Sequence, residues 1–314
     1  MVTLEQCPNC GNPDSGLLFS GYDRFHDIEG NYYLQECSIC GLIYLNPRPG
    51  LEEIERYYPE DYIAYPKAIE DEPNWFRRLD RKYGLHKRIK HVSRRVNKPG
   101  NILDIGCATG IFLHGMQLQG WNAFGIEPSK HAADYARQRF GLSVVRGFLE
   151  DTHFPDSFFN LVSMWDVLEH VPEPLVTLTE VNRILAPGGW IVLSLPNPAS
   201  WDCSWFGPYW AGWDLPRHMQ IFKPKVISSI LKKEGFSHPE IISFMDRHGM
   251  LVYSIRFWLS DKAFSPLINN CILALVGSIP ARLLTYPYYA VADCFNKSPT
   301  MVIFAQKKVG EDEK

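Results

Sequence analysis

Four of the eight cysteines stand in two close pairs near the amino terminus. Cys7 and Cys10 form the first C-x-x-C pair, and Cys37 and Cys40 form the second. A glycine follows each pair and permits the tight turn in which backbone N–H groups approach sulfur. Two such turns supply the four thiolates of a tetrahedral zinc ion, with no position left open. The spacing therefore predicts a structural Zn²⁺ site in a zinc ribbon over residues 1–48.

The distribution of the cysteines also indicates in which cellular compartment the protein resides. Eight would suit four disulfides, but the other four are scattered at Cys107, Cys203, Cys271 and Cys294. Two pairs and four scattered thiols favour a metal site in a reducing compartment. The first residues lack the charged and apolar regions of a signal peptide. We therefore expect a cytoplasmic protein.

A second group of chemistry-bearing residues surrounds a glycine turn. An apolar run ends in Asp104, Gly106 follows, and Gly110 opens a helical stretch. Glycines there let a ligand approach the backbone, and a helix amino terminus favours a carboxylate. Glu127 stands at the end of the next apolar run, where its carboxylate can accept two ribose hydroxyls. The stretch does not read G-x-G-x-x-G, so it does not match a dinucleotide fingerprint.

The elements that must position these residues alternate between strand and helix after residue 98. Strands are expected at residues 102–105, 123–126, 144–145, 161–164, 191–195, 240–244 and 300–306, and helices at 111–119, 130–140, 174–185 and 226–233. Such alternation with glycine at the turns predicts an α/β fold with a doubly wound parallel sheet.

Residues 98–245 and the last strand resemble the class I S-adenosylmethionine-dependent methyltransferases. Residues 103–110 (LDIGCATG) resemble the family's first motif, with Ala108 where many members have a third glycine. Residues 125–129 (GIEPS) resemble the ribose-binding motif, residues 146–150 the segment that lines adenine, and residues 158–171 the fourth-strand motif, with Asn160 where Asp is frequent. Residues 185–190 (LAPGGW) resemble the turn before the fifth strand.

This resemblance implies a Rossmann-like, seven-stranded methyltransferase sheet that binds S-adenosylmethionine. The residues that it implies for cofactor binding are Asp104, Gly106, Cys107, Gly110, Glu127, Phe148, Leu149 and Asp166. Methyl transfer requires in-line attack on a sulfonium, so orientation, desolvation and a base supply the rate. The candidate bases are His170 and His218, each of which could instead be a hydrogen-bonded structural histidine.

Three further segments could contact an acceptor. Residues 201–213 hold four tryptophans, which could stack on a sugar, cover a prenyl chain or form a small core under a lid. Residues 75–95 hold nine Lys or Arg and one acid, although the whole chain has a net charge of −3. This basic helix, within a connector at 49–97, is either a solvated face or a docking surface for phosphate-bearing acceptors or anionic lipid.

The third segment is an apolar helical insertion at residues 249–299, before the last strand and tail at 300–314. Residues 263–281 carry no charge, but prolines interrupt them. A spanning helix needs about 20 consecutive apolar residues, so interfacial helices are favoured over a span. A buried dimer face and a wall of the acceptor pocket stay open as alternatives. The methyltransferase domain itself is expected at 98–248.

The cysteine pairs, residues 41–49 (GLIYLNPRP) and the tyrosine-rich connector are similar to sugar and cell-surface glycan methyltransferases. That resemblance implies methyl transfer to a small-molecule or glycan-pathway acceptor, either a nucleotide-linked sugar or a membrane-linked intermediate. The membrane-linked case would add peripheral contact with the inner membrane face. Alternatives are a prenylated or lipid phenol and an RNA-binding methyltransferase. The absence of overall positive charge counts against RNA, and the intact motif residues count against a cofactor-binding regulator without activity.

Overall fold

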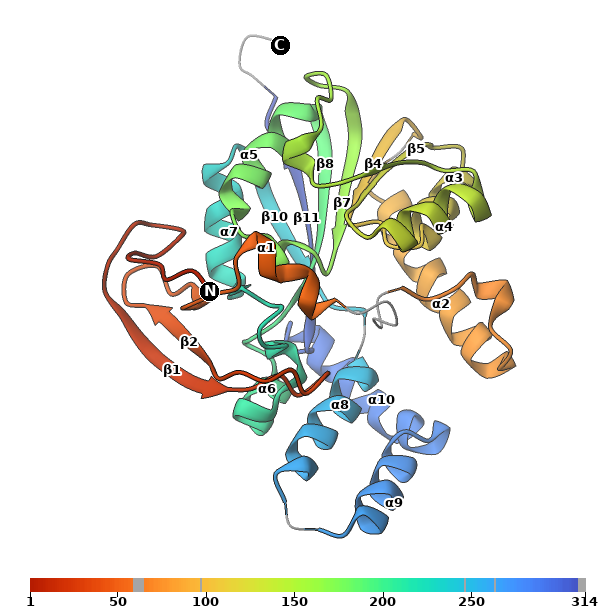
Figure 1. Ribbon diagram of the computed structural model, residues 1–314. Helices are drawn as coiled ribbons and strands as arrows, with labels where there is room; N and C mark the ends of the chain where they lie inside the picture. The colour runs from red at the N-terminus through yellow and green to blue at the C-terminus, as the bar shows by residue number, and fades with distance from the viewer. Residues whose placement is uncertain (59–64, 97, 246, 263, 310–314) are drawn as a thin grey trace. The chain divides into compact units, whose positions relative to one another are not determined.

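The computed structural model describes residues 1–58, 65–96, 98–245, 247–262 and 264–309 (Figure 1). The chain forms two compact units. Unit 1 consists of Met1–Tyr57, Leu195–Ile227 and Ile241–Val302, and unit 2 consists of Tyr58–Ser194, Ser228–Glu240 and Ile303–Lys314. Each unit combines stretches that lie far apart in the sequence. The five linear domains expected above stay a prediction.

Unit 2 carries most of a seven-stranded sheet in the order β10-β11-β8-β7-β4-β5-β6. Its strands are β4 (Asn101–Ile105), β5 (Asn122–Glu127), β6 (Ser143–Arg146), β7 (Phe159–Trp165), β8 (Leu185–Pro196), β10 (Phe236–Ile242) and β11 (Thr300–Lys307). The pairings β4–β5, β5–β6, β4–β7 and β7–β8 are all parallel. The central strands are buried almost continuously, as expected for a parallel sheet covered on both faces. The α/β, Rossmann-like fold class is confirmed.

The last strand departs from the all-parallel expectation. The N–H of Lys308 donates to the carbonyl of Gly235, and the Ser237 hydroxyl donates to the carbonyl of Gln306. The residue number on one strand increases from Gly235 to Ser237 while that of the bonded partner decreases from Lys308 to Gln306, so β11 runs antiparallel to β10. The chain leaves β10 at its end and returns at the same edge of the sheet, so the next strand must run back. The sheet is therefore mixed.

Helices flank this sheet. They are α2 (Trp75–Ser93), α3 (Ile111–Gln117), α4 (Lys130–Phe140), α5 (Pro174–Ile184) and α7 (Pro224–Lys233), with 3-10 turns η2 (Ile69–Asp71), η3 (Leu149–Asp151) and η4 (Leu168–His170). Figure 1 shows α3 and α4 beside β4 and β5, where they pack. Helix α2 packs on α3 through Gly115, where a Cβ atom would lie 2.8 Å from Ile89 Cδ1. The absence of a side chain at Gly115 thus brings the basic helix close to the glycine turn.

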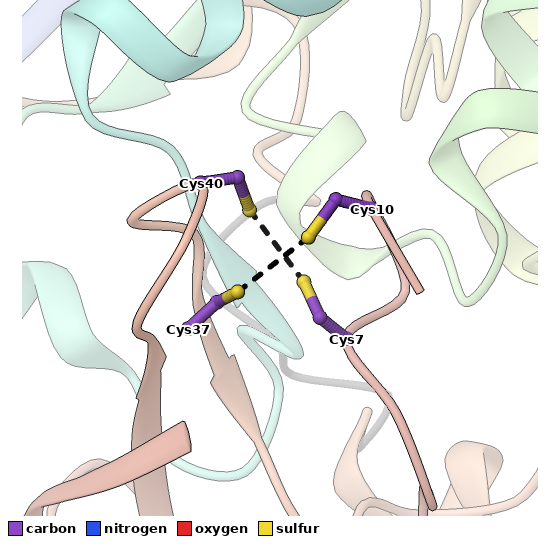
Figure 2. A group of neighbouring side chains, drawn as sticks. All are labelled: Cys7, Cys10, Cys37 and Cys40. Atoms are coloured by element: carbon purple, nitrogen blue, oxygen red, sulfur yellow. Dashed lines mark hydrogen bonds between the residues drawn. The ribbon is translucent and has the colours of Figure 1, made fainter. Parts of the chain in front are cut away.

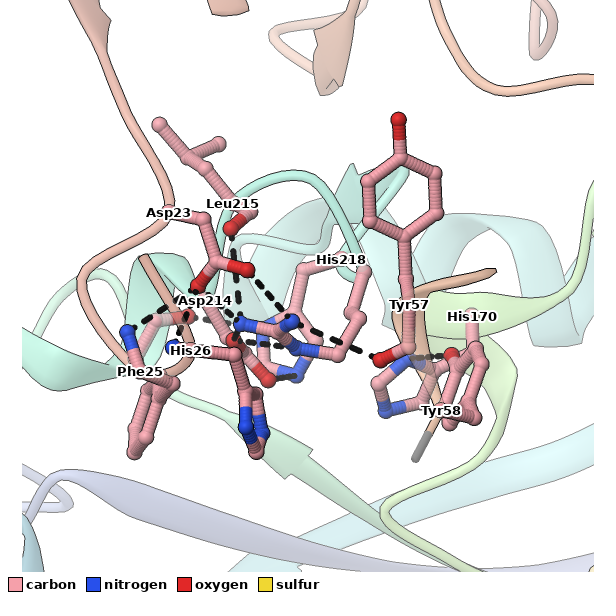
Figure 3. Close-up of polar contacts among 11 residues, drawn as sticks. Asp23, Phe25, His26, Tyr57, Tyr58, His170, Asp214, Leu215 and His218 are labelled. Carbon is pink, nitrogen blue, oxygen red and sulfur yellow. Dashed lines mark hydrogen bonds and ion pairs between the residues drawn. The ribbon is translucent and has the colours of Figure 1, made fainter. Parts of the chain in front are cut away.

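Unit 1 contains a four-stranded sheet in the order β1 (Ser15–Gly21), β2 (Tyr32–Cys37), β3 (Ile43–Leu45) and β9 (Gln220–Ile221). All of its pairings are antiparallel. Beside it, the guanidinium of Arg217 donates to Asp23 (2.7 and 2.9 Å) and Asp214 (2.8 Å). Figure 3 shows the two carboxylates converging. The Arg217 and Asp23 side chains are fully buried, so each charge depends on its partner.

The remaining elements of unit 1 are helical. They are α1 (Leu51–Ile54), η1 (Glu55–Tyr57), α6 (Trp201–Phe206), η5 (Gly207–Tyr209), η6 (Ala211–Trp213), α8 (Arg247–Ser260), α9 (Pro266–Val276) and α10 (Ile279–Cys294). Trp210 and Trp213 are buried and pack edge to face, so they form the small core that was one alternative for the aromatic segment. Trp205 is exposed and stacks on Tyr288.

Among the described residues, no single helix is long and apolar enough to cross a membrane. The pair α9 and α10 reaches that length and hydropathy together, but the two axes are bent by 62°.

Candidate functional site

The turn between β4 and α3 requires glycine at two positions. Gly106 has φ of +68°, and a Cβ atom there would lie 2.6 Å from Val167 Cγ2. Gly110 has φ of +79°, and its Cβ would lie 2.6 Å from Leu142 Cδ1. The N–H groups of Gly106 and Cys107 both donate to the carbonyl of Ile126, which fixes the turn against the end of β5. Ala108 also adopts a left-handed φ of +48°, a strain that a glycine would avoid.

Two buried carboxylates follow from this arrangement. Asp104 accepts a hydrogen bond from the Ser163 hydroxyl at 2.6 Å. Glu127 accepts from the N–H of Ala108 at 2.9 Å and from that of Ser129 at 2.8 Å. Each residue is 3% exposed. Burial raises the pKa of both carboxyl groups to about 7.

Two residues that the sequence does not single out flank these carboxylates, Tyr65 on the side of Glu127 and Arg88 on the side of Asp104. Tyr65 lies close to Glu127, since burial and then the Glu127 charge raise the pKa of its phenol to about 12. Arg88, on α2, places its guanidinium carbon 5.1 Å from the ring centroid of Trp165, and its charge opposes the rise in the pKa of Asp104. In the sequence, Tyr65 was one of many connector tyrosines and Arg88 one of nine basic residues, so nothing singled them out.

The other predicted cofactor residues follow strand ends. Phe148 and Leu149 come after β6, and Leu149 is buried whereas Phe148 is exposed. Asp166 comes directly after β7 and accepts from the Ser194 hydroxyl at 2.7 Å. Because β4, β5, β6 and β7 are parallel, these residues share the carboxyl edge of the sheet with Asp104 and Glu127. The structure thus brings the predicted cofactor residues together.

Asn160 lies at the opposite edge, at the start of β7. Its side-chain oxygen accepts from the N–H of Asn101 at 2.9 Å. An amide oxygen provides this acceptor as an aspartate would, so the departure from the family motif leaves the β4–β7 contact intact.

The two candidate bases belong to different units. His170, in η4 of unit 2, has Nδ1 2.9 Å from the Tyr58 hydroxyl (Figure 3). His218, in unit 1, is buried and its Nδ1 donates to the carbonyl of Gly212 at 2.9 Å. Burial lowers the pKa of His218, which favours the neutral ring. His218 therefore has the backbone hydrogen bond expected of a structural histidine, and His170 shares a unit with Asp166.

The four N-terminal cysteines converge as the sequence predicts (Figure 2). The Sγ atoms of Cys7 and Cys40 are 3.6 Å apart, those of Cys10 and Cys37 are 3.5 Å apart, and all four lie within 4.8 Å of one another. A tetrahedral zinc with Zn–S bonds of about 2.3 Å separates its sulfurs by about 3.8 Å. Disulfides would need about 2.05 Å. The donor set thus fits zinc.

The two cysteine turns have matching backbones. The N–H of Gly11 donates to the carbonyl of Cys7, and that of Gly41 to the carbonyl of Cys37, at 2.9 and 3.0 Å. Both glycines have a left-handed φ, of +71° and +73°. The glycine after each pair therefore performs the role that its position in the sequence predicts.

Comparison with known proteins assigns the family. A family model described as a methyltransferase domain matches residues 76–238, more than half of the chain. The chain belongs to this methyltransferase family. Ubiquinone biosynthesis O-methyltransferases are similar: that of Nitrosospira multiformis is 25% identical over 185 residues, covering 54% of this chain and 76% of the relative. That of Cereibacter sphaeroides is 28% identical over 177 residues, covering 52% and 69%.

A solved structure shows the shared fold. Phosphoethanolamine N-methyltransferase 2 of Haemonchus contortus, in complex with S-adenosyl-L-methionine, superposes with a TM-score of 0.50 at 18% identity. The match covers 72% of this chain and 53% of that enzyme. The methyltransferase is an S-adenosylmethionine-dependent enzyme of class I, as the motifs in its sequence imply.

Proposed function

We propose that this methyltransferase binds S-adenosylmethionine at the carboxyl edge of its sheet and transfers the methyl group to a lipid-borne small molecule. The supporting observation is the buried Glu127 carboxylate beside the glycine turn. The cofactor-binding residues would be Asp104, Gly106, Cys107, Gly110, Glu127, Phe148, Leu149 and Asp166. Glu127 would accept the two ribose hydroxyls, and Phe148 with Leu149 would contact the adenine.

Arg88 adds a charge that the motifs do not include. The methionine end of the cofactor carries a carboxylate, and Arg88 lies over Trp165 at the end of β7. A guanidinium can pair with a carboxylate through two parallel hydrogen bonds. We therefore assign Arg88 to the cofactor carboxylate, at the end of the site opposite Glu127.

The bound cofactor supplies an electrophilic sulfonium methyl, and the protein orients it, excludes water and accepts a proton from the acceptor. We propose His170 as the base. For its Nε2 to accept a proton, Nδ1 must carry the ring hydrogen and donate to the Tyr58 oxygen, 2.9 Å away. Tyr58 is then a positioning residue that selects the tautomer. His218 is the second candidate, since its Nδ1–H···O=C bond also leaves Nε2 without a hydrogen.

For the acceptor we propose a membrane-linked intermediate of a glycan pathway. The apolar helices α9 and α10 support a lipid-borne acceptor over a free sugar nucleotide. A prenylated phenol is the second candidate, favoured because the similar proteins are named ubiquinone biosynthesis O-methyltransferases. We also propose a structural zinc ion on Cys7, Cys10, Cys37 and Cys40, and a cytoplasmic enzyme at the inner membrane face.

Labelled S-adenosylmethionine tests the acceptor class. Purified enzyme would be incubated with membrane lipid extract, with a set of sugar nucleotides or with RNA, and the labelled product class identified. We expect label in the lipid fraction, within lipid-linked sugars, and no transfer by Glu127→Ala. Label in phenolic lipids would select the second candidate. Label in sugar nucleotides or RNA alone would refute a lipid-borne acceptor.

The pKa of Glu127 predicts how cofactor binding depends on pH. A carboxyl with a pKa of about 7 is mostly protonated at pH 6 and ionised at pH 8. Ribose hydroxyls donate better to the ionised form, so affinity for S-adenosylhomocysteine should rise up to about tenfold over this interval. Binding at pH 7 should release protons, which calorimetry in buffers of different ionisation enthalpy measures. The nearby titratable groups are Asp104, Tyr65 and Cys107. Burial raises the pKa of the Tyr65 phenol and of the Cys107 thiol, so both stay neutral throughout this interval, and Asp104 titrates beside Glu127. Constant affinity would contradict a ribose contact by Glu127.

A further inference from the structure

Helix α9 has a composition and an exposure that do not fit a helix in water. Its sequence, PLINNCILALV, contains no charged residue, and none of its residues is buried. Leu267 is 74% exposed and Leu275 is 71% exposed. A helix with apolar side chains on all sides is ordinarily covered by protein or lipid.

The neighbouring helix α10 continues this surface. It buries only Tyr289 and Ala292, whereas Leu283 and Leu284 are 68% and 80% exposed. We define the apolar hairpin as α9 and α10 together. Isolated exposed leucines are common, but several of them on two consecutive helices indicate an interaction site.

Polar contacts tie the end of α9 and the middle and second half of α10 to other elements of unit 1. The Nε2–H of His248, on α8, donates to the carbonyl of Val276 at 2.9 Å, and the Thr285 hydroxyl lies 3.0 Å from its Nδ1. Tyr289 donates to the buried carboxylate of Asp202 at 2.9 Å. The end of α9 and two positions on α10 are thus tied to unit 1, which fixes the arrangement of the apolar side chains around them.

The dimensions of the hairpin favour a membrane surface over a span. At 1.5 Å per residue, α9 and α10 are about 17 and 24 Å long, shorter than the roughly 30 Å of a hydrocarbon core. They pass the length and hydropathy criteria only together, and the bend of 62° prevents one straight crossing. Short apolar helices that cannot span can lie in the headgroup boundary.

The charges around the hairpin are complementary to anionic lipid. Asp261 is engaged by Arg24 at 3.0 and 3.2 Å, and Asp293 pairs with Arg247. These internal partners neutralise both acids of the insertion. Lys262 lies 5.2 Å from the ring centroid of the partly exposed Trp258. Tryptophan and lysine beside the start of an apolar segment are the usual anchors at headgroup level.

We propose that the apolar hairpin docks the enzyme onto an anionic phospholipid monolayer. Leu267, Leu275, Leu283 and Leu284 enter the acyl boundary, and Trp258 with Lys262 stays among the headgroups. Docking itself does not depend on which acceptor the enzyme methylates. That it delivers the enzyme to its acceptor rests on the proposed lipid-borne substrate.

Flotation with vesicles tests docking. The probes are phosphatidylcholine vesicles with and without about one-third phosphatidylglycerol. The double variant Leu283→Ser/Leu284→Ser should partition at least tenfold more weakly than the natural protein. The matched control is Leu17→Ser/Leu18→Ser, an adjacent pair of exposed leucines on β1 of the same unit, and it should float normally. Lys262→Glu should weaken binding to the anionic vesicles more than to the neutral ones.

Three results would overturn the proposal. The first is that the natural protein does not float with either kind of vesicle. The second is that the two leucine variants lose vesicle binding equally. The third is that the protein does not bind vesicles but is a dimer, which Leu283→Ser/Leu284→Ser dissociates. The last would assign the hairpin to a second copy of the chain. Affinity for S-adenosylhomocysteine should be unchanged in every variant. If the enzyme floats with vesicles but labels no lipid, the proposed acceptor is refuted and docking is retained. If the enzyme labels detergent-dispersed lipid but does not float, docking is refuted and the proposed acceptor is retained.

Discussion

Replacing Cys37 by serine should release the proposed zinc ion and unfold the four-stranded sheet of unit 1. Structural zinc contributes about 10–16 kcal/mol of apparent binding free energy, and so short a segment has too little core to fold without it. Cys37 ends β2, and its N–H donates to the carbonyl of Leu42. Amide protection should therefore disappear over residues 1–48, as hydrogen exchange with mass spectrometry would measure.

The structure extends this expectation beyond the N-terminal segment. Strand β9 pairs with β3, and Arg217 depends on Asp23 for its buried ion pair. An unfolded N-terminal segment leaves that guanidinium buried without its main partner, which is strongly unfavourable. Exchange should therefore also increase over residues 217–221, while affinity for S-adenosylhomocysteine stays within about threefold, a change below 1 kcal/mol.

Cys271→Ser and Cys294→Ser provide the matched controls, because both thiols are exposed and lie on α9 and α10. Each control should keep one zinc per chain by elemental analysis. A natural protein without zinc, or unchanged exchange in Cys37→Ser, would show that the four cysteines are not a metal site.

The sequence predicts those elements that local interactions determine. The strand, turn and helix at 101–117 have the expected type, since alternating burial, left-handed glycines and helical periodicity are all local properties. Strand β9 could not be predicted, because two residues carry no period and form a strand only by pairing with β3. The direction of β11 likewise depends on where the insertion returns the chain.

The candidate site also contains residues that the local sequence predicts and residues that only tertiary packing brings there. Asp104 and Glu127 follow from their positions at strand ends, and the structure brings them together. Tyr65 and Arg88 depend on tertiary packing. Arg88 reaches Trp165 only because Gly115 allows α2 to approach α3, a contact between segments without a shared pattern. Composition also could not distinguish the buried Trp210 from the exposed Trp205.

Glu127→Gln should weaken cofactor binding strongly and leave the fold intact. Two charge-assisted hydrogen bonds to ribose hydroxyls are worth about 1.5–3 kcal/mol each, so affinity for S-adenosylhomocysteine should fall by roughly 10²–10⁴-fold. Glutamine retains one acceptor oxygen for the N–H of Ala108 or of Ser129, but its NH₂ group faces the other donor. Calorimetry measures the loss.

The free energy of unfolding of Glu127→Gln should be equal to or greater than that of the natural protein. Burial raises the pKa of Glu127 from 4.5 to about 7. The folded state therefore binds more protons than the unfolded state between these values, so the contribution of Glu127 to stability falls as pH rises from about 4.5 to 7. At pH 8 the ionised group costs about 3 kcal/mol, which the neutral amide avoids. Thermal unfolding at pH 8 should show a melting temperature that is not lowered by Glu127→Gln.

Glu240→Gln is the matched control in the same unit. Glu240 lies on β10 and pairs with Arg95, two residues after the end of α2, and the partly exposed pair is worth little in water. This variant should bind S-adenosylhomocysteine normally, which separates the loss of a specific carboxylate from the loss of any glutamate. If Glu127→Gln kept full affinity, Glu127 would be a structural residue that holds the Ala108 and Ser129 amides, and the ribose would require another acceptor. The combination of lost binding and retained stability is expected only if the buried charge is maintained for the ligand at a cost to the fold.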